Sequence, residues 1–210
     1  MEMKTRPRGR PRSFDPDTAL EAALLLFWEH GYEGTSLARL QEVTGLTAPA
    51  WYRAFGSKER LFELAVQRYQ ERYGFGIRDD LPLVAAVSDY LDRAAREFTT
   101  LPGRGCLVST GMLATSPDAR FAAGVVRAER ERAVEMLRER FTHAVTDGEL
   151  PEGVDANALA RTLAALIQGM SVQARDGAGY EQLRLVAQTA ERLIPNRADR
   201  GSTADNDKGQ

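Results

Sequence analysis

The feature that most constrains the fold is an apolar pattern with helical spacing, which glycine and proline residues interrupt at short intervals. The first run of this kind is formed by Leu20, Ala23, Leu24, Phe27 and Trp28. Gly31 ends this run, and comparable runs follow one another as far as Leu193. No stretch alternates strongly enough between apolar and polar residues to predict a strand. We therefore predict an all-α protein.

The same interruptions divide the chain into expected helices. Capping residues such as Thr47 and Ser57 precede several of the apolar runs and strengthen these assignments. The expected helices span approximately residues 16–30, 37–44, 48–55, 57–73, 82–99, 106–114, 117–145, 155–175 and 179–193. The pattern therefore predicts three short helices, then one linking helix, then a larger helical block.

Composition limits the classes of protein to consider. The chain has 210 residues, of which 43% are apolar, and this allows one large domain or a small and a medium one. Cys106 is the single cysteine, so an intramolecular disulfide is impossible and a reducing compartment is expected. No apolar run approaches the roughly 20 residues of a membrane helix, and no signal-peptide core follows the basic N-terminus. We therefore expect a cytoplasmic protein with no membrane partner.

The segment from about Ser36 to Phe55 predicts a helix-turn-helix, in which two short helices flank a turn at Gly45. In this arrangement the second helix lies in the major groove of DNA and the first crosses the backbone. The residues suited to these contacts are Thr47, Ala48, Pro49, Tyr52 and Arg53. At least one of Trp51 and Phe55 is expected to anchor the helix to the core. The alternative is an ordinary packed helix pair with surface charges.

The basic N-terminal stretch favours the DNA-binding interpretation. The formal net charge is only −2, so any nucleic-acid partner must be recognised by local positive charge. The stretch "RPRGRPR" places an arginine at every second position, and its prolines keep it extended. An extended arginine-rich arm fits the narrow minor groove of A·T-rich DNA, so Arg8, Arg10 and Arg12 are candidate contacts. The alternative is a solvated, disordered tail.

Taken together, these motifs resemble the N-terminal domain of the TetR family of bacterial transcriptional regulators. The resemblance covers about residues 13–66 and rests on "FWEHGYEGTS", the turn "TGLT", "WYRAFGSKERLF" and the "GRPR" of the arm. It extends into one branch of the family through "GCLVSTGML" and "DGELPEGVDANALARTLAALIQGMSVQARDG". The resemblance therefore spans nearly the whole folded chain.

The resemblance implies an all-α homodimer that binds a near-palindromic DNA operator and releases it when a small molecule binds. Carried over to this chain, it implies phosphate contacts at Thr35 and Thr47. It also implies that Tyr52 and Lys58 bind the DNA backbone and clamp the domain to it. Ala48, Pro49 and Arg53 become the groove-facing positions. One departure is Ala54, because many members carry Tyr or His there, and a phosphate contact is expected to be missing.

The resulting domain prediction has four parts. Residues 1–13 form a basic flexible arm, and residues 14–56 form the DNA-binding domain. Residues 57–194 form the ligand-binding and dimerisation domain, beginning with a linking helix over residues 57–73. Residues 195–210 form a polar tail that we expect to be disordered.

Two sets of apolar residues are assigned within the C-terminal block. The expected dimer interface is formed by Leu159, Leu163, Leu166, Ile167, Met170, Leu183, Val186 and Ala190. The candidate ligand-pocket residues are Tyr90, Phe98, Met112, Phe121, Met136 and Phe141. For each of these residues, plain core packing is the competing interpretation.

Two further alternatives remain at this stage. Cys106 follows Arg104 and Gly105 at an expected helix start, an environment that lowers the pKa of a thiol and would suit a redox or electrophile sensor. A free cysteine is also a common small core residue. A ligand-independent architectural DNA-binding dimer is the second alternative. No nucleophile–base pair, phosphate loop or metal-ligand spacing appears, so we expect no enzyme activity, cofactor or metal.

Overall fold

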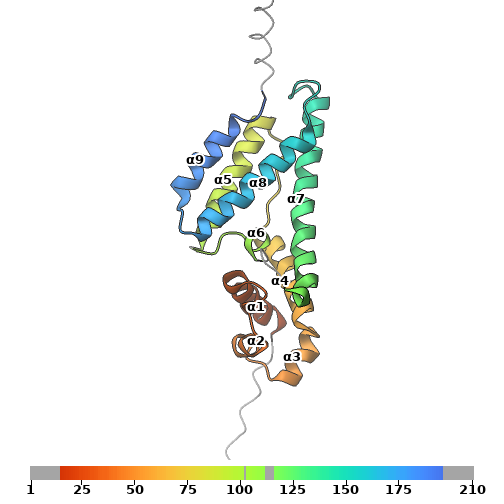
Figure 1. The fold of residues 1–210 in the computed structure, drawn as a ribbon, viewed down its shortest axis with the longest axis vertical. Coiled ribbons are helices and arrows are strands. Elements are labelled where there is room, and N and C mark those ends of the chain that lie inside the picture. The colour runs from red at the N-terminus through yellow and green to blue at the C-terminus, as the bar shows by residue number, and fades with distance from the viewer. Residues whose placement is uncertain (1–14, 102, 112–115, 196–210) are drawn as a thin grey trace, which may run out of the picture.

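The computed structural model describes residues 15–101, 103–111 and 116–195 and confirms the all-α prediction. Figure 1 shows the arrangement of the helices. The described residues form α1 Pro16–His30, α2 Leu37–Thr44, α3 Ala48–Phe55, α4 Lys58–Tyr73, α5 Leu83–Thr100, α6 Leu107–Thr110, α7 Arg120–Thr146, α8 Ala156–Arg175 and α9 Tyr180–Glu191, with a short 3-10 helix at Pro117–Ala119. None of these helices is both long enough and apolar enough to cross a membrane.

Side-chain caps fix several helix starts where the sequence predicts them. The Ser36 hydroxyl accepts a hydrogen bond from the backbone N–H of Arg39, and Ser57 does the same for Arg60. The expected helix over residues 106–114 is observed only as the single turn of α6, and residues 112–115 lie outside the described part of the chain.

The core of the N-terminal half is aromatic and is not confined to the helix-turn-helix. Its largest fully buried side chains are Phe27 and Trp28 from α1, Trp51 from α3 and Phe62 from α4. Apolar residues of α6 and of the beginning of α7 also belong to this core, namely Leu107, Val108, Ala122 and Val126. Parts of the chain beyond α4 therefore complete the packing of the N-terminal half.

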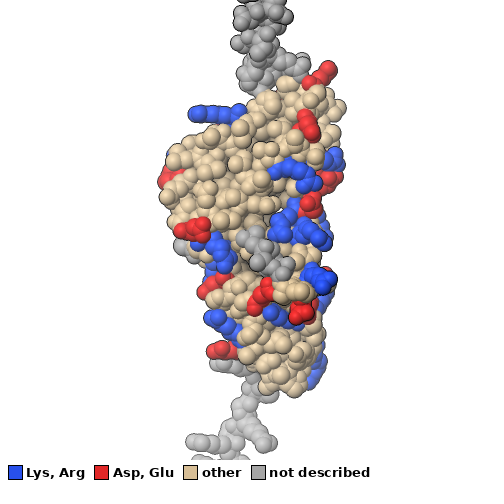
Figure 2. Space-filling view, viewed as in Figure 1, with Lys and Arg blue, Asp and Glu red and all other residues tan. Residues whose placement is uncertain are grey.

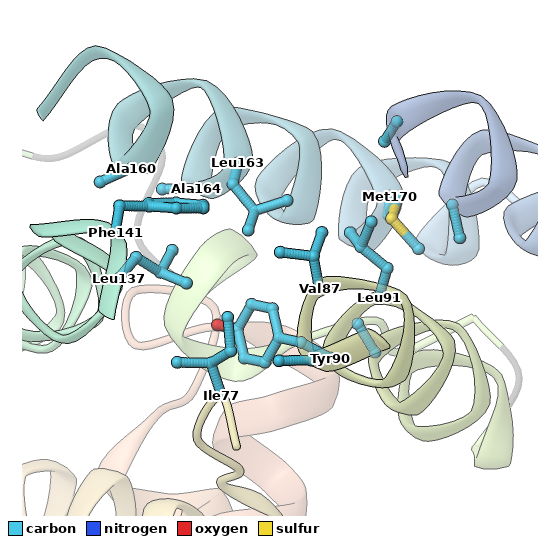
Figure 3. Packing of buried hydrophobic residues seen from close by; sticks show 14 of the residues in the cluster. Ile77, Val87, Tyr90, Leu91, Leu137, Phe141, Ala160, Leu163, Ala164 and Met170 are labelled. Atoms are coloured by element: carbon cyan, nitrogen blue, oxygen red, sulfur yellow. The ribbon is translucent and has the colours of Figure 1, made fainter. Parts of the chain in front are cut away.

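The second core lies among α5, α7, α8 and α9. Figure 3 shows Leu137 and Phe141 of α7 and Leu163 of α8 directed towards α5, with Met170 near the junction of α5, α8 and α9. The long helix α7 runs alongside α4 and α8, so it belongs to both halves of the molecule (Figure 1). A displacement of α7 would therefore change the packing of both cores.

Candidate nucleic-acid interface and ligand cavity

The turn between α2 and α3 has the geometry of a helix-turn-helix. Gly45 ends α2 with a φ of 68°, the left-handed conformation that glycine adopts at little cost. The backbone N–H of Leu46 then donates to the carbonyl oxygen of Gln41, which closes the turn. Thr47 begins α3 in an extended conformation, and its side chain makes no capping hydrogen bond. The first N–H groups of α3 and the exposed Thr47 hydroxyl are therefore open to an external acceptor.

The two faces of α3 have opposite environments. Trp51 and Phe55 are buried and hold α3 against the core. The opposite face is exposed, and Tyr52 leaves 48% of its surface in solvent. The other exposed residues around it are Thr47, Ala48, Pro49, Arg53 and Ala54. This face therefore offers hydroxyls, small apolar groups and one guanidinium on a helix that is rigidly anchored from behind.

Lys58 lies at the beginning of α4, next to this face in the chain. Its ammonium lies 4.1 Å from the centroid of the Tyr32 ring, and partial burial lowers the pKa of the amine. The Tyr32 hydroxyl donates to the Glu59 carboxylate at 3.0 Å. These contacts hold the first turn of α4 against the end of α1.

Two groups of residues expected to contact DNA are not found on the exposed face of α3. Thr35 is fully buried, and its hydroxyl donates to the carbonyl oxygen of Gly31 at 2.7 Å, so this side chain is not presented at the surface. The three arm residues Arg8, Arg10 and Arg12 lie outside the described residues.

A cavity of about 90 Å³ lies between α4, α5, α6, α7 and α8. Five aromatic side chains line it, and they are Tyr69, Tyr73, Phe75, Tyr90 and Phe98. The polar lining includes Arg130 and Gln168, and the Cys106 side chain also reaches the cavity. Burial raises the pKa of Tyr90 to about 12, and it also raises the pKa of Tyr69 well above its ordinary value, so both phenols remain protonated at neutral pH.

Of the six residues that the sequence analysis assigned to a ligand pocket, two line this cavity. Tyr90 and Phe98 line the cavity. Met112 lies outside the described residues, and Phe121 is half exposed in an outer groove between α4 and α7. Phe141 is buried in the C-terminal core and Met136 packs against it, but neither lines the cavity. Arg130, Tyr69 and Tyr73 were not identified from the sequence, because no local pattern distinguishes a cavity residue from a core residue.

The cavity is connected to the N-terminal half through residues 103–111, which we call the bridging segment. The indole N–H of Trp28 donates to the carbonyl oxygen of Gly105 at 2.9 Å in a buried hydrogen bond. The next residue, Cys106, donates its backbone N–H to the Ser171 hydroxyl of α8 at 2.7 Å. Arg130 of α7 donates to the carbonyl oxygen of Val108 at 2.8 Å. The bridging segment therefore contacts α1, α7 and α8 while it forms one wall of the cavity.

The residues assigned to a dimer interface divide between core and surface. Leu163, Met170, Leu183 and Ala190 are buried within their own domain, and Leu159, Leu166, Ile167 and Val186 are partly exposed. The outer face of α8 and α9 is completed by residues not assigned before, among them Ala165, Gly169, Val172 and Leu185. Leu185 is 61% exposed. Figure 2 shows that the area over these two helices carries few charged side chains, most of them at its edges.

Comparisons with known proteins agree with this arrangement. Residues 19–65 match the family of bacterial regulatory proteins of the tetR type, and residues 83–195 match the C-terminal domain of BetI-type transcriptional repressors. The chain is similar to the HTH-type transcriptional repressor ComR of Escherichia coli K12, with 38% identity over 90% of this chain and 92% of that protein. BdcR of the same organism, also an HTH-type transcriptional repressor, is 29% identical over 91% of this chain and 94% of that protein.

The chain is also similar to a protein whose structure was solved with DNA bound. The TetR family transcriptional regulator CifR, as a cysteine mutant complexed with 26-bp double-strand operator DNA, superposes with a TM-score of 0.83. It is 38% identical to this chain, and the alignment covers 89% of this chain and all of that one.

Proposed function

Because the chain belongs to the TetR family of bacterial regulatory proteins, we propose that it represses transcription as a homodimer, which a small molecule releases from a near-palindromic operator. The family consists of DNA-binding regulators, so the expectation that the chain is not an enzyme is confirmed by its membership. The observation that carries the rest of the proposal is the cavity, because its wall includes both the linking helix α4 and the bridging segment.

The exposed face of α3 is the proposed recognition surface. Thr47 and Tyr52 present hydroxyls that suit phosphate oxygens, and Lys58 supplies a cation at the same end of the domain. Ala48 and Pro49 are small enough to lie against a thymine methyl. Arg53 is long enough for a guanine edge or a phosphate. In this proposal Ala54 adds no polar contact to the exposed face.

The cavity supports a ligand-responsive mechanism over an architectural one. A ligand-independent DNA-binding dimer has no need for a hollow C-terminal core, whereas this chain has a cavity lined by Tyr69 and Tyr73 of α4. A ligand that fits best when α4 is displaced would favour a second spacing of the recognition helices. Operator affinity would then fall by the ratio of the ligand affinities of the two states.

The outer face of α8 and α9 is the proposed dimer interface. It combines small residues such as Gly169 with exposed apolar residues such as Val172 and Leu185. A two-fold contact here would pair the two C-terminal domains and place two recognition helices on one side of the dimer. Two half-sites centred one DNA turn apart, about 34 Å, require such a pairing.

The experiment that tests this function is selection of operator DNA. The purified protein is incubated with sheared genomic DNA from its source organism, and the retained fragments are sequenced. We expect a few enriched sites that share an inverted repeat, and weaker retention by the variants Arg53→Ala and Tyr52→Phe. Uniform retention that depends strongly on salt would instead indicate architectural binding.

A second candidate mechanism uses the thiol of Cys106, because this side chain reaches the cavity. A small electrophile with an activated double bond would form a C–S bond with the sulfur, and the thiol proton would pass to the adduct. The substitution Cys106→Ser separates the two mechanisms. If the thiol is the sensor, the variant binds the operator normally and no longer responds to the electrophile.

A further inference from the structure

Arg130 differs from Arg140, the buried arginine of the C-terminal domain, in the partners of its guanidinium. Arg140 is 5% exposed, and its guanidinium forms an ion pair with Glu149 at 2.9 Å. The Arg130 guanidinium is partly buried and donates to the Val108 carbonyl oxygen. Within the part of the chain that the structure describes, no carboxylate forms an ion pair with it.

Among the described residues, one carboxylate lines the cavity, and it pairs with residues other than Arg130. Glu129 accepts a hydrogen bond from the Gln70 side chain at 3.3 Å and forms an ion pair with Arg132. Arginine remains protonated in proteins, even though burial lowers the pKa of Arg130. Arg130 therefore brings a positive charge to the cavity wall with no carboxylate paired to it among the described residues, while Glu129 lines the same wall and Arg130 also borders an outer groove beside Glu131. A bound anion would gain a direct ionic contact with this guanidinium.

The other polar groups that line the cavity are mainly hydrogen-bond donors, so they favour a ligand with hydrogen-bond acceptors. The hydroxyls of Tyr69 and Tyr90 are protonated, and the side chains of Ser109 and Gln168 can also donate hydrogen bonds. The remaining wall is apolar and aromatic, with Phe75 and Phe98 among its residues. A ligand that matches both properties has an anionic group and an apolar body.

The volume limits the size of this ligand. The cavity of about 90 Å³ is smaller than the roughly 150 Å³ cavity that is known to hold a benzene molecule. A compact monocarboxylate would therefore fill it and widen it slightly. A nucleotide or another large phosphate ester does not fit without opening the cavity.

We propose that the effector is a compact organic carboxylate whose anionic group is bound by Arg130 and whose apolar body lies against the aromatic wall. This inference rests on the proposed function, because it identifies the chemical class of the effector. The carboxylate would supply the partner that the guanidinium lacks among the described residues, through a charge-assisted and potentially bidentate contact. The same contact would connect the ligand to Val108 in the bridging segment, through the hydrogen bond that Arg130 already makes.

The test compares carboxylates with neutral molecules of the same shape. Benzoate and 3-methylbutanoate are titrated into the full-length protein by calorimetry, beside benzamide and 3-methylbutanamide. We expect at least one carboxylate to bind about tenfold or more tightly than its amide, because the amide lacks the charge. Arg130→Gln should abolish that preference, and Arg130→Lys should keep part of it.

Folding and the proposed function are controlled separately. Arg138→Gln is the matched control, since Arg138 lies on the same helix and pairs with Glu135 outside the cavity. Equal affinity for carboxylate and amide, a preference that survives Arg130→Gln in a folded variant, or no carboxylate binding at all would overturn the inference. Carboxylate binding that needs Arg130, in a protein that selects no operator, would support the inference and contradict the proposed function.

Discussion

Trp51 and Arg53 are two positions apart on α3, and their environments are opposite. Trp51 is fully buried, whereas Arg53 is exposed. Within the described residues, the Arg53 side chain makes no hydrogen bond or ion pair, so none has to be broken when DNA binds. The helix supplies a rigid support on one side and an available guanidinium on the other, which is the property that a DNA-reading residue needs.

The substitution Arg53→Ala should weaken specific operator binding by about 1–3 kcal/mol for each half-site. Gel-shift titration at two salt concentrations distinguishes the kind of contact. Loss of a phosphate contact reduces the salt dependence and weakens all sequences alike, whereas loss of a base contact relaxes specificity at one position. Arg138→Ala, a partly exposed arginine of α7, is the control, and an equal effect of both variants would contradict the assignment.

Gly105 is a second residue whose identity the structure explains. Its φ is 59°, and a Cβ atom at this position would lie 2.4 Å from the backbone carbonyl oxygen of Ser171. Gly103 has a similar φ of 75° but has open space where its Cβ would be. The two glycines therefore separate the cost of the left-handed conformation from the cost of close contact with α8.

We expect Gly103→Ala to lower the free energy of unfolding by about 1 kcal/mol, which is the cost of the left-handed conformation. Gly105→Ala should cost at least about 1 kcal/mol more, because backbone atoms of α8 must move. Urea denaturation of both variants measures the difference. Equal losses would mean that the bridging segment does not press against α8.

At the scale of elements, α1 is attached to the C-terminal domain by specific polar contacts as well as by apolar packing. The indole N–H of Trp28 is bonded to Gly105, and the Arg175 guanidinium at the end of α8 donates to the carbonyl oxygen of Glu29 at 3.2 Å. These contacts join α1 to elements that form or border the cavity. Through these contacts, a proposed effector in the cavity could change the position of α1 without moving α4.

The two tryptophans provide a controlled measurement of this attachment. Both are fully buried, but the indole N–H of Trp51 has no hydrogen-bond partner within the described residues. Trp28→Phe leaves the Gly105 carbonyl oxygen without its donor, and we expect it to cost about 1–3 kcal/mol more than Trp51→Phe. Chemical denaturation followed by circular dichroism measures both variants. Similar losses would show that the indole hydrogen bond contributes little beyond ring packing.

The helices were predictable from sequence because their ends depend on local chemistry. Ser36 and Ser57 form the expected caps, and Gly31 and Gly45 end helices with positive φ angles. The exposed face of α3 was predictable for the same reason, since the spacing of Trp51 and Phe55 defines the buried side.

The cavity was only partly predictable, because it depends on the space that five helices leave between them. Tyr90 and Phe141 are both buried aromatic residues on amphipathic helices, and only Tyr90 reaches the cavity. Arg130 belongs to a helix rich in charged residues, and its lack of an acidic partner among the described residues is a property of the tertiary structure. For the proposed dimer interface, the sequence pattern likewise did not distinguish buried from exposed apolar residues, since Leu163 and Met170 are buried in the domain and Val172 is exposed.

At the scale of the whole molecule, the proposed function requires two chains. One chain presents one recognition helix, and a single half-site contact gives modest affinity. Pairing two chains makes the second contact effectively intramolecular, which raises affinity by about a hundredfold or more when the spacing matches. In the proposed mechanism, the stability of the dimer would therefore control operator binding as strongly as any contact on α3.

The substitution Leu185→Glu tests this dependence. It places a charge on the outer face of α8 and α9, where a paired copy would desolvate it in the proposed dimer, so we expect monomers by analytical ultracentrifugation. Operator affinity should fall by about a hundredfold or more, while the unfolding transition of the chain changes little, because Leu185 is exposed in the monomer. Phe121→Glu is the matched control, since Phe121 is 50% exposed at the α4–α7 groove, and it should leave the dimer intact. If Leu185→Glu remains dimeric and Phe121→Glu does not, the pairing surface lies along α4 and α7, and the effector would then act on the interface itself.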